Sequence, residues 1–252
     1  MFRTFFRWFV ALALILFLAS CNTAPAPAPQ TTPNTQAVAT PIDPATAASI
    51  SGVVHFEGIP PAPQKIDMSG DPGCQGQNQS ETVIVNDGHL ANVLVYVKDG
   101  LDGRSFPAPP EKVTILQENC RYVPHVAAAM VGQNVEFVDK DDTLHNIHPM
   151  PKNNVEWNQS EMPKGSFARS FTAAEIMIPI KCNQHPWMKM YLSVLGTPFF
   201  AITGKDGRFA LKGLPPGTYS IAAVHEKFGE QEVKITLAPK EDKKDMGFEF
   251  RP

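Results

Sequence analysis

The hydrophobic pattern of this chain is that of short β-strands. From residue 50 onward, apolar and β-branched residues gather in short runs, and no stretch keeps the 3.6-residue period of an amphipathic helix. Turn signals separate the runs at 86–88, 206–207 and 215–217. The predicted strands are 51–56, 82–85, 91–97, 113–116, 134–138, 176–180, 191–195, 199–202, 209–211, 219–224 and 232–237. This pattern predicts an all-β fold of sandwiches or barrels.

The N-terminus has a different pattern. Arg3 and Arg7 precede an apolar run at 9–19 of about 11 residues, whereas a membrane span needs roughly 20. The run ends in Leu18-Ala19-Ser20-Cys21, which resembles a bacterial lipobox. The resemblance implies a lipoprotein signal peptide at 1–20 and a lipid anchor on Cys21. An ordinary signal peptide and an uncleaved anchor remain alternatives.

Residues 21–49 are rich in Pro, Ala and Thr and almost uncharged, which predicts a disordered tether between anchor and folded part. We therefore expect the protein at the cell envelope, on its periplasmic or extracellular face. Asn22, in place of Asp, favours the outer membrane if the host has one, by resemblance to bacterial sorting signals. The net charge of -3 argues against a nucleic-acid partner.

The four cysteines divide by role. Cys21 is assigned to lipid, and Cys182 lies in a metal-ligand pattern, which leaves Cys74 and Cys120. An exported chain reaches an oxidising compartment, so we predict that these two form a disulfide. The bridge would close a loop of about 46 residues and stabilise the fold by about 4 kcal/mol. Two free thiols are the alternative.

Candidate metal chemistry lies in Cys182-Asn-Gln-His185-Pro-Trp-Met188, directly after the predicted strand 176–180. Blue copper sites use two imidazoles, one thiolate and a weak thioether, and this loop offers three of the four ligands. The fourth must come from elsewhere. A glycine, a strand, a polar turn and His145-Asn146 lie upstream. Zinc also accepts two His and one Cys, but no His-Glu-x-x-His pattern accompanies them.

These motifs make residues 112–196 resemble a cupredoxin domain, a Greek-key β-barrel or sandwich. The short loop, with a proline after its histidine, is similar to that of amicyanin. The resemblance implies one mononuclear type 1 copper held by His145, Cys182, His185 and Met188. His148 remains the alternative to His145, and Met190 the alternative to Met188.

The resemblance also implies roles for neighbouring residues. Asn146 is expected to hydrogen-bond to the cysteine loop and lock it. His185 is expected to be the ligand nearest solvent, with Pro186 and Trp187 as an apolar rim for a redox partner. Plain core packing is the alternative for Trp187. The acidic run 139–142 is interpreted as a solvated turn, and Pro179 indicates an edge position or a bulge.

A second resemblance covers the flanks. Residues 200–219 are similar to the carboxypeptidase regulatory-like, transthyretin-like β-sandwich, and Gly52–Pro60 resembles its opening phrase. We expect the copper domain to interrupt this sandwich, whose strands would then come from 50–111 and 197–252. Two consecutive domains are the alternative.

The combination resembles bacterial proteins described as methylamine-utilisation or plastocyanin-like proteins. It implies a membrane-anchored electron carrier that meets a redox partner protein and is not an enzyme. Copper capture and delivery is one competing function. A carbohydrate- or protein-binding module without redox chemistry is another.

Overall fold

The computed structural model describes residues 40–74 and 79–252, and over these ranges the chain forms strands and loops without a helix. The expected signal peptide, Cys21 and most of the expected tether lie outside the described residues. Within the described ranges there is no helix long and apolar enough to cross a membrane. The all-β fold class predicted from the sequence is confirmed.

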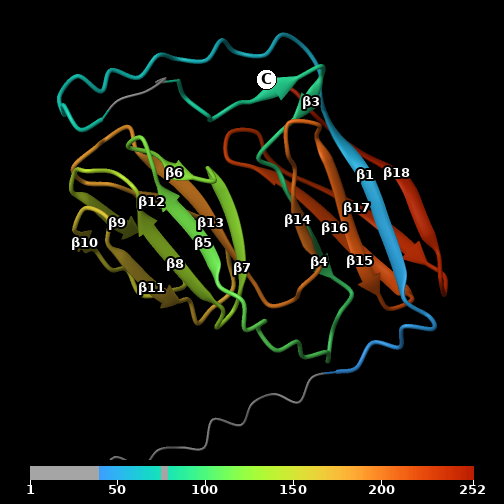
Figure 1. Cartoon of the computed structure of the whole chain (residues 1–252). Helices are drawn as coiled ribbons and strands as arrows, with labels where there is room; N and C mark the ends of the chain where they lie inside the picture. Colours follow the sequence, from blue (N-terminus) through green and yellow to red (C-terminus); the bar gives the residue numbers. More distant parts are fainter. Residues whose placement is uncertain (1–39, 75–78) are drawn as a thin grey trace, which may run out of the picture. The chain divides into compact units, whose positions relative to one another are not determined.

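One pair of sheets is formed by consecutive strands and is called here the central sandwich (Figure 1). One sheet has the order β10-β9-β12-β13-β7 and the other β11-β8-β5-β6. Its members are β5 (Val113–Gln117), β6 (Tyr122–Val123), β7 (Val126–Met130), β8 (Asn134–Asp139), β9 (His145–Pro149), β10 (Gln159–Glu161), β11 (Ser166–Ser170), β12 (Glu175–Lys181) and β13 (Lys189–Leu195).

The other pair of sheets, the terminal sandwich, takes its strands from both sides of that segment. One sheet has the order β15-β1-β3-β2 with β18 also paired to β1, and the other β14-β4-β16-β17. Its members are β1 (Ala48–Phe56), β2 (Val85–Asn86), β3 (His89–Leu90), β4 (Leu94–Asp99), β14 (Phe200–Ile202), β15 (Arg208–Leu214), β16 (Gly217–His225), β17 (Gly229–Leu237) and β18 (Asp242–Phe250).

Strand pairing joins distant parts of the chain in the terminal sandwich. β1 pairs in parallel with β18 and antiparallel with β15, and β4 lies between β14 and β16. The two sheets enclose one apolar core that includes Ile50, Leu90 and Phe250. β1 already begins at Ala48, two residues inside the expected tether. The domain boundaries given above stay a prediction.

Each sandwich has its own core, and a smaller cluster packs between them. Leu94, Tyr96 and Val224 of the terminal sandwich meet Leu195 at the end of β13. His125 of the central sandwich hydrogen-bonds to Glu226 beside β16. His125 is buried in this position.

The hydrophobic pattern of the sequence does not predict several of the observed strands. β7 is largely alanine, a residue with weak β-propensity, and its place comes from parallel pairing with β13. β18 opens with charged residues, and only Met246, Phe248 and Phe250 show the alternation. Pro179 follows an irregularity between Glu175 and Ile178, in line with the expected bulge, whereas the expected edge position is wrong because β12 lies between β9 and β13.

Candidate metal centre

The β12–β13 hairpin brings Cys182 and Met188 opposite each other. Ile180 pairs with Met190 and Lys181 with Lys189, so the next rung joins Cys182 to Met188. The Cys182 N–H donates to the Met188 carbonyl at 3.0 Å, which closes this rung. Directly opposed side chains on one face lie about 4.5–5.5 Å apart at Cβ. Met190 lies two rungs deeper, opposite Ile180, so the register favours Met188.

β9 presents its two histidines to opposite sides. His145 and Ile147 lie on the core face, because side chains two apart in a strand share a face. His148 points the other way, where its ring contacts Asn183 and Glu156. The pleat therefore brings His145, and not its runner-up His148, to the side chains of Cys182 and His185.

Three donor atoms converge where β9 meets this loop. His145 Nδ1 lies 3.1 Å from His185 Nδ1, and His185 Nδ1 lies 3.7 Å from Cys182 Sγ. The ligand atoms of all three residues lie within 4.8 Å of one another. The three residues are 1%, 3% and 1% exposed, so the donor set is almost closed to water.

A carboxylate holds the far nitrogen of each imidazole. His145 Nε2 lies 2.8 Å from Asp141 Oδ2, and His185 Nε2 lies 2.9 Å from Asp71 Oδ2. An Nε2–H that donates to a carboxylate leaves the Nδ1 lone pair free to bind an ion. Hydrogen bonds from His185 and Thr143 lower the pKa of Asp71 to about 2, so Asp71 is an anion at neutral pH.

The Cys182 thiol is buried, and backbone N–H groups surround its sulfur. Burial raises the pKa of Cys182, while N–H groups of His185, Gln184 and Asn146 act in the opposite direction. The thiol is therefore protonated in the metal-free protein, and an ion that binds there must displace the proton. Asn146 Oδ1 accepts the Asn183 N–H at 2.7 Å and so links β9 to the cysteine loop.

A buried acidic group lies beside the donor set. Glu161 is the cross-strand partner of His145, Asp139 pairs with Gln117, and each of these polar side chains is less than 5% exposed. Burial raises the pKa of Glu161 to about 7 and also raises the pKa of Asp139. The expected solvated turn at 139–142 is thus partly wrong, because Asp139 ends β8 inside the core and Asp141 contacts His145.

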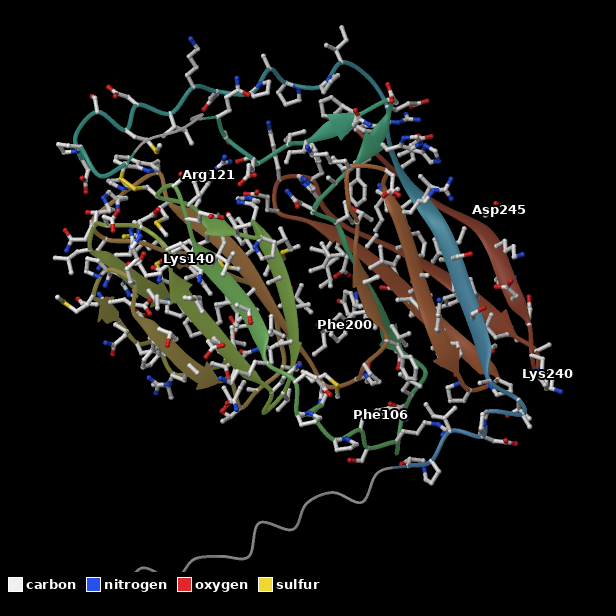
Figure 2. All side chains as sticks on the ribbon, viewed as in Figure 1. Phe106, Arg121, Lys140, Phe200, Lys240 and Asp245 are labelled. Atoms are coloured by element: carbon white, nitrogen blue, oxygen red, sulfur yellow. A yellow bond between two sulfur atoms is a disulfide. The ribbon has the colours of Figure 1, made fainter. Side chains whose placement is uncertain are left out.

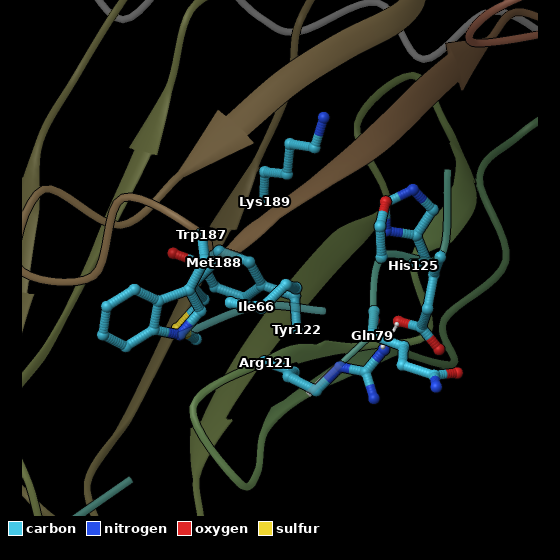
Figure 3. Close-up of a pocket in the computed structure, with 10 residues that line it drawn as sticks. Ile66, Gln79, Arg121, Tyr122, His125, Trp187, Met188 and Lys189 are labelled. Atoms are coloured by element: carbon cyan, nitrogen blue, oxygen red, sulfur yellow. Dashed lines mark hydrogen bonds and ion pairs between the residues drawn. The ribbon is translucent and has the colours of Figure 1, made fainter. Parts of the chain in front are cut away.

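The surroundings of His185 differ from the expected open rim. Trp187 packs against a small cluster of Met68, Cys74 and Cys120, and its ring lies 5.1 Å from that of His185. Trp187 and Met188 line a pocket together with Ile66 of the segment that precedes β2 (Figure 3). Pro186 is exposed, whereas Trp187 is half-buried. The segment that contains Ile66 and Met68 therefore covers part of the Trp187 surface that was expected to face a redox partner.

The predicted disulfide between Cys74 and Cys120 is confirmed, with an S–S distance of 1.96 Å and Cα atoms 5.4 Å apart. It appears in yellow near Arg121 (Figure 2).

Sequence reasoning missed Asp71, Asp141 and Glu161. Asp71 is 114 residues from His185 in the chain, so no local spacing could have connected them.

Comparison with known proteins gives partial structural likenesses. No protein-family model matches the chain, and no curated protein matches its sequence. An oxidised amicyanin mutant matches at a TM-score of 0.30 and 17% identity, over 33% of this chain and 81% of its own. A purple cupredoxin from Nitrosopumilus maritimus gives 0.29 and 20%, over 32% of this chain and 98% of its own. A Cu-containing nitrite reductase from Thermus scotoductus SA-01 matches at a TM-score of 0.32 and 20% identity, over 38% of this chain and 24% of its own.

Proposed function

We propose that this protein holds one mononuclear copper ion of the blue type and carries single electrons at the cell envelope. The observation that carries the proposal is the convergence of His145 Nδ1, His185 Nδ1 and Cys182 Sγ in a buried position, with Met188 opposite the cysteine. Two imidazoles, a thiolate and a thioether form the donor set of blue-copper electron-transfer sites.

The spacing of the donors fits a single ion. Bonds of about 2.0 Å to nitrogen and about 2.3 Å to sulfur, at angles of about 100° to 120°, separate two donors by about 3.1 to 3.7 Å. In the structure the separations are 3.1 Å between the two Nδ1 atoms and 3.7 Å from His185 Nδ1 to Cys182 Sγ. Copper bound there would alternate between Cu(II) and Cu(I), and so take up and release one electron.

The chain's own residues give the site its rigidity. Asp141 and Asp71 fix the two imidazoles, and Asn146 fixes the loop that carries Cys182. A donor set held in this way moves little when an ion changes its charge, which favours fast electron transfer. Burial of the three strong ligands excludes water from the ion. With Met188 as the fourth ligand, the proposed site has no coordination position for a substrate, so we propose an electron carrier and not an enzyme.

The lipid anchor on Cys21 belongs to the same proposal and rests on the sequence of the first 21 residues. It would hold the carrier at the membrane, where a redox partner protein could reach it. The terminal sandwich would then act as a support between anchor and copper site.

Copper capture and delivery is the second candidate, because the same ligands bind Cu(I). Carrier and delivery protein differ in how firmly the ion is held. A carrier keeps its copper in the presence of a strong Cu(I) chelator while it still exchanges electrons. A delivery protein loses the ion to the chelator.

The first experiment adds Cu(II) to the metal-free protein and records visible absorption and electron paramagnetic resonance. We expect an intense blue band from the Cys182 thiolate and one copper per chain. Cys182→Ser is the matched control and should bind without colour. Met188→Leu and Met190→Leu then separate the axial candidates, since only the former should change the spectrum. A wild-type protein that is reduced at Cys182 yet stays colourless would refute the proposal.

A further inference from the structure

The segment Met68–Cys74, called here the strap, crosses the metal end of the central sandwich although it lies between β1 and β2 in the chain (Figure 1). Met68 is 3% exposed and packs with the disulfide and Trp187. A Cβ on Gly73 would lie 2.9 Å from Thr143 Cβ, so only glycine allows this approach to the turn before His145. The strap is therefore seated closely on the site.

Asp71 is the part of the strap that reaches the donor set. Its Oδ2 accepts from His185 Nε2 at 2.9 Å and from Thr143 Oγ1 at 2.7 Å, while Oδ1 accepts the Gly73 N–H at 2.7 Å. Both oxygens are engaged, so the carboxylate has a fixed orientation. Its acceptance of Nε2–H selects the His185 tautomer whose Nδ1 lone pair faces Cys182.

The disulfide links this carboxylate to the one that holds the other imidazole. The Cys74 N–H donates to the Asp71 carbonyl at 3.0 Å. The Cys120 and Asn119 N–H groups donate to the two oxygens of Asp141 at 2.8 and 2.7 Å. Each half of the bridge thus holds the aspartate that orients one of the two histidines, and both sulfurs lie within 4.8 Å of a His185 ligand atom.

We propose that Asp71, held over the site by the Cys74–Cys120 disulfide, is a positioning residue that fixes the tautomer and orientation of His185. The inference rests on the proposed function for the identity of the metal. The tautomer itself is a property of the metal-free protein. Asp71 reaches the nitrogen of His185 that faces away from Cys182, so it acts through the imidazole.

The test compares Asp71→Ala with Asp67→Ala, a matched control on the adjoining part of the same segment. The Asp67 carboxylate is exposed and accepts from Ser69 N at 3.0 Å, with no contact to His185. The first readout is the pair of ¹⁵N ring shifts of His185 in the metal-free full-length protein. We expect wild type and Asp67→Ala to show the Nε2–H tautomer, and Asp71→Ala to show a mixture of both tautomers.

The second readout is copper affinity, measured by competition with a chelator of known strength. Loss of a carboxylate that orients a ligand histidine lowers metal affinity about 10- to 100-fold, so Asp71→Ala should fall in that range and Asp67→Ala should match wild type. Asp71→Asn keeps an oxygen that accepts Nε2–H, and it should restore most of the wild-type ¹⁵N pattern. Identical ring shifts and affinity in Asp71→Ala and Asp67→Ala would overturn the proposal.

The tether is tested with the double variant Cys74→Ala, Cys120→Ala. We expect its His185 ring shifts to move toward those of Asp71→Ala, and unchanged shifts would remove the disulfide from the proposal. Reduction of the wild-type bridge by a dithiol, followed by the same spectrum, gives this answer if the double variant does not fold. If wild type binds no copper, the proposed function fails, while the metal-free spectra still decide the role of Asp71.

Discussion

The central and terminal sandwiches differ most in what they bury. Most buried polar side chains of the described residues lie in the central sandwich, where Asn146 and Glu161 are next to the candidate ligands. The terminal sandwich buries only three, Thr203, Ser220 and His225, around a large apolar core. Burial of polar groups is costly unless they are paired. The central sandwich therefore carries more of that cost, and part of it falls on the groups around His145 and His185.

The largest effect on copper affinity should come from replacement of His145 on β9. His145→Ala removes a ligand, and we expect copper affinity to fall by more than about 100-fold, beyond the usual effect of a supporting residue. His148→Ala changes the same residue type on the opposite face and should leave affinity within a few fold of wild type. Copper titration against a competing chelator measures both. Equal losses of copper affinity in the two variants would contradict the assignment of His145, and not His148, as the ligand from β9.

Truncation of the two cores tests whether the site belongs to one sandwich. Ile115→Ala in β5 and Ile221→Ala in β16 each remove a side chain that is 0% exposed. Each should lower the free energy of unfolding by about 2–5 kcal/mol, measured by chemical denaturation of the metal-free protein. Copper affinity of the folded Ile221→Ala variant should remain that of wild type. A changed copper spectrum in this variant would break the separation between the two cores.

The pH dependence of stability should come partly from His225 in the terminal sandwich. Burial lowers the pKa of His225 to about 4, and its Nε2 has no partner among the described residues. The unfolded chain binds this proton near pH 6.5 and the folded protein only near pH 4, so stability is full above pH 6.5 and falls as the pH drops toward 4. The loss approaches about 3 kcal/mol.

His225→Asn is the test variant, because the asparagine side-chain oxygen can replace the Nδ1 atom that accepts the Lys227 N–H. We expect denaturation midpoints of this variant to vary less between pH 7 and pH 4.5 than those of wild type. His89→Asn, in the same sandwich, should keep the wild-type slope. An unchanged slope in His225→Asn would assign the pH dependence to other groups.

The smallest effect should follow removal of a buried hydroxyl in the terminal sandwich. Thr203 Oγ1 donates to the Leu90 carbonyl at 2.8 Å and accepts the Val93 N–H at 3.1 Å. Thr203→Val leaves both backbone groups without this partner and should cost about 1–3 kcal/mol of stability. Copper affinity should not change, since the hydroxyl serves only the backbone. Thermal denaturation with and without copper measures both quantities.

Sequence reasoning reached the parts of this molecule that depend on local pattern. Strands with β-branched or alternating residues were predicted, and so was the loop from Cys182 to Met188, whose members lie within seven positions of one another. The structure brings His145 to that loop, although its binding of a metal stays a prediction. The disulfide followed from assigning the other cysteines to separate roles.

The rest depends on tertiary contacts. Nothing near Asp71 in the sequence indicates that its carboxylate meets His185, because that contact exists only once the strap crosses the central sandwich. Asp139 was assigned to solvent because short acidic runs usually form exposed turns. Its burial follows from the pairing of β8 with β5, which places it beside Gln117. Alanine-rich β7 likewise needs β13 as a template.

The pairing of β1 with β18 bears on the order of events during synthesis. Among the described strands, Ala48–Phe56 leaves the ribosome first, and its parallel neighbour Asp242–Phe250 follows all the others. Every strand of the central sandwich is therefore available before the terminal sandwich can be completed. A chain that stops before β18 would already contain every strand of the central sandwich. It would also expose one edge of β1, an unpaired strand edge of the kind that promotes aggregation.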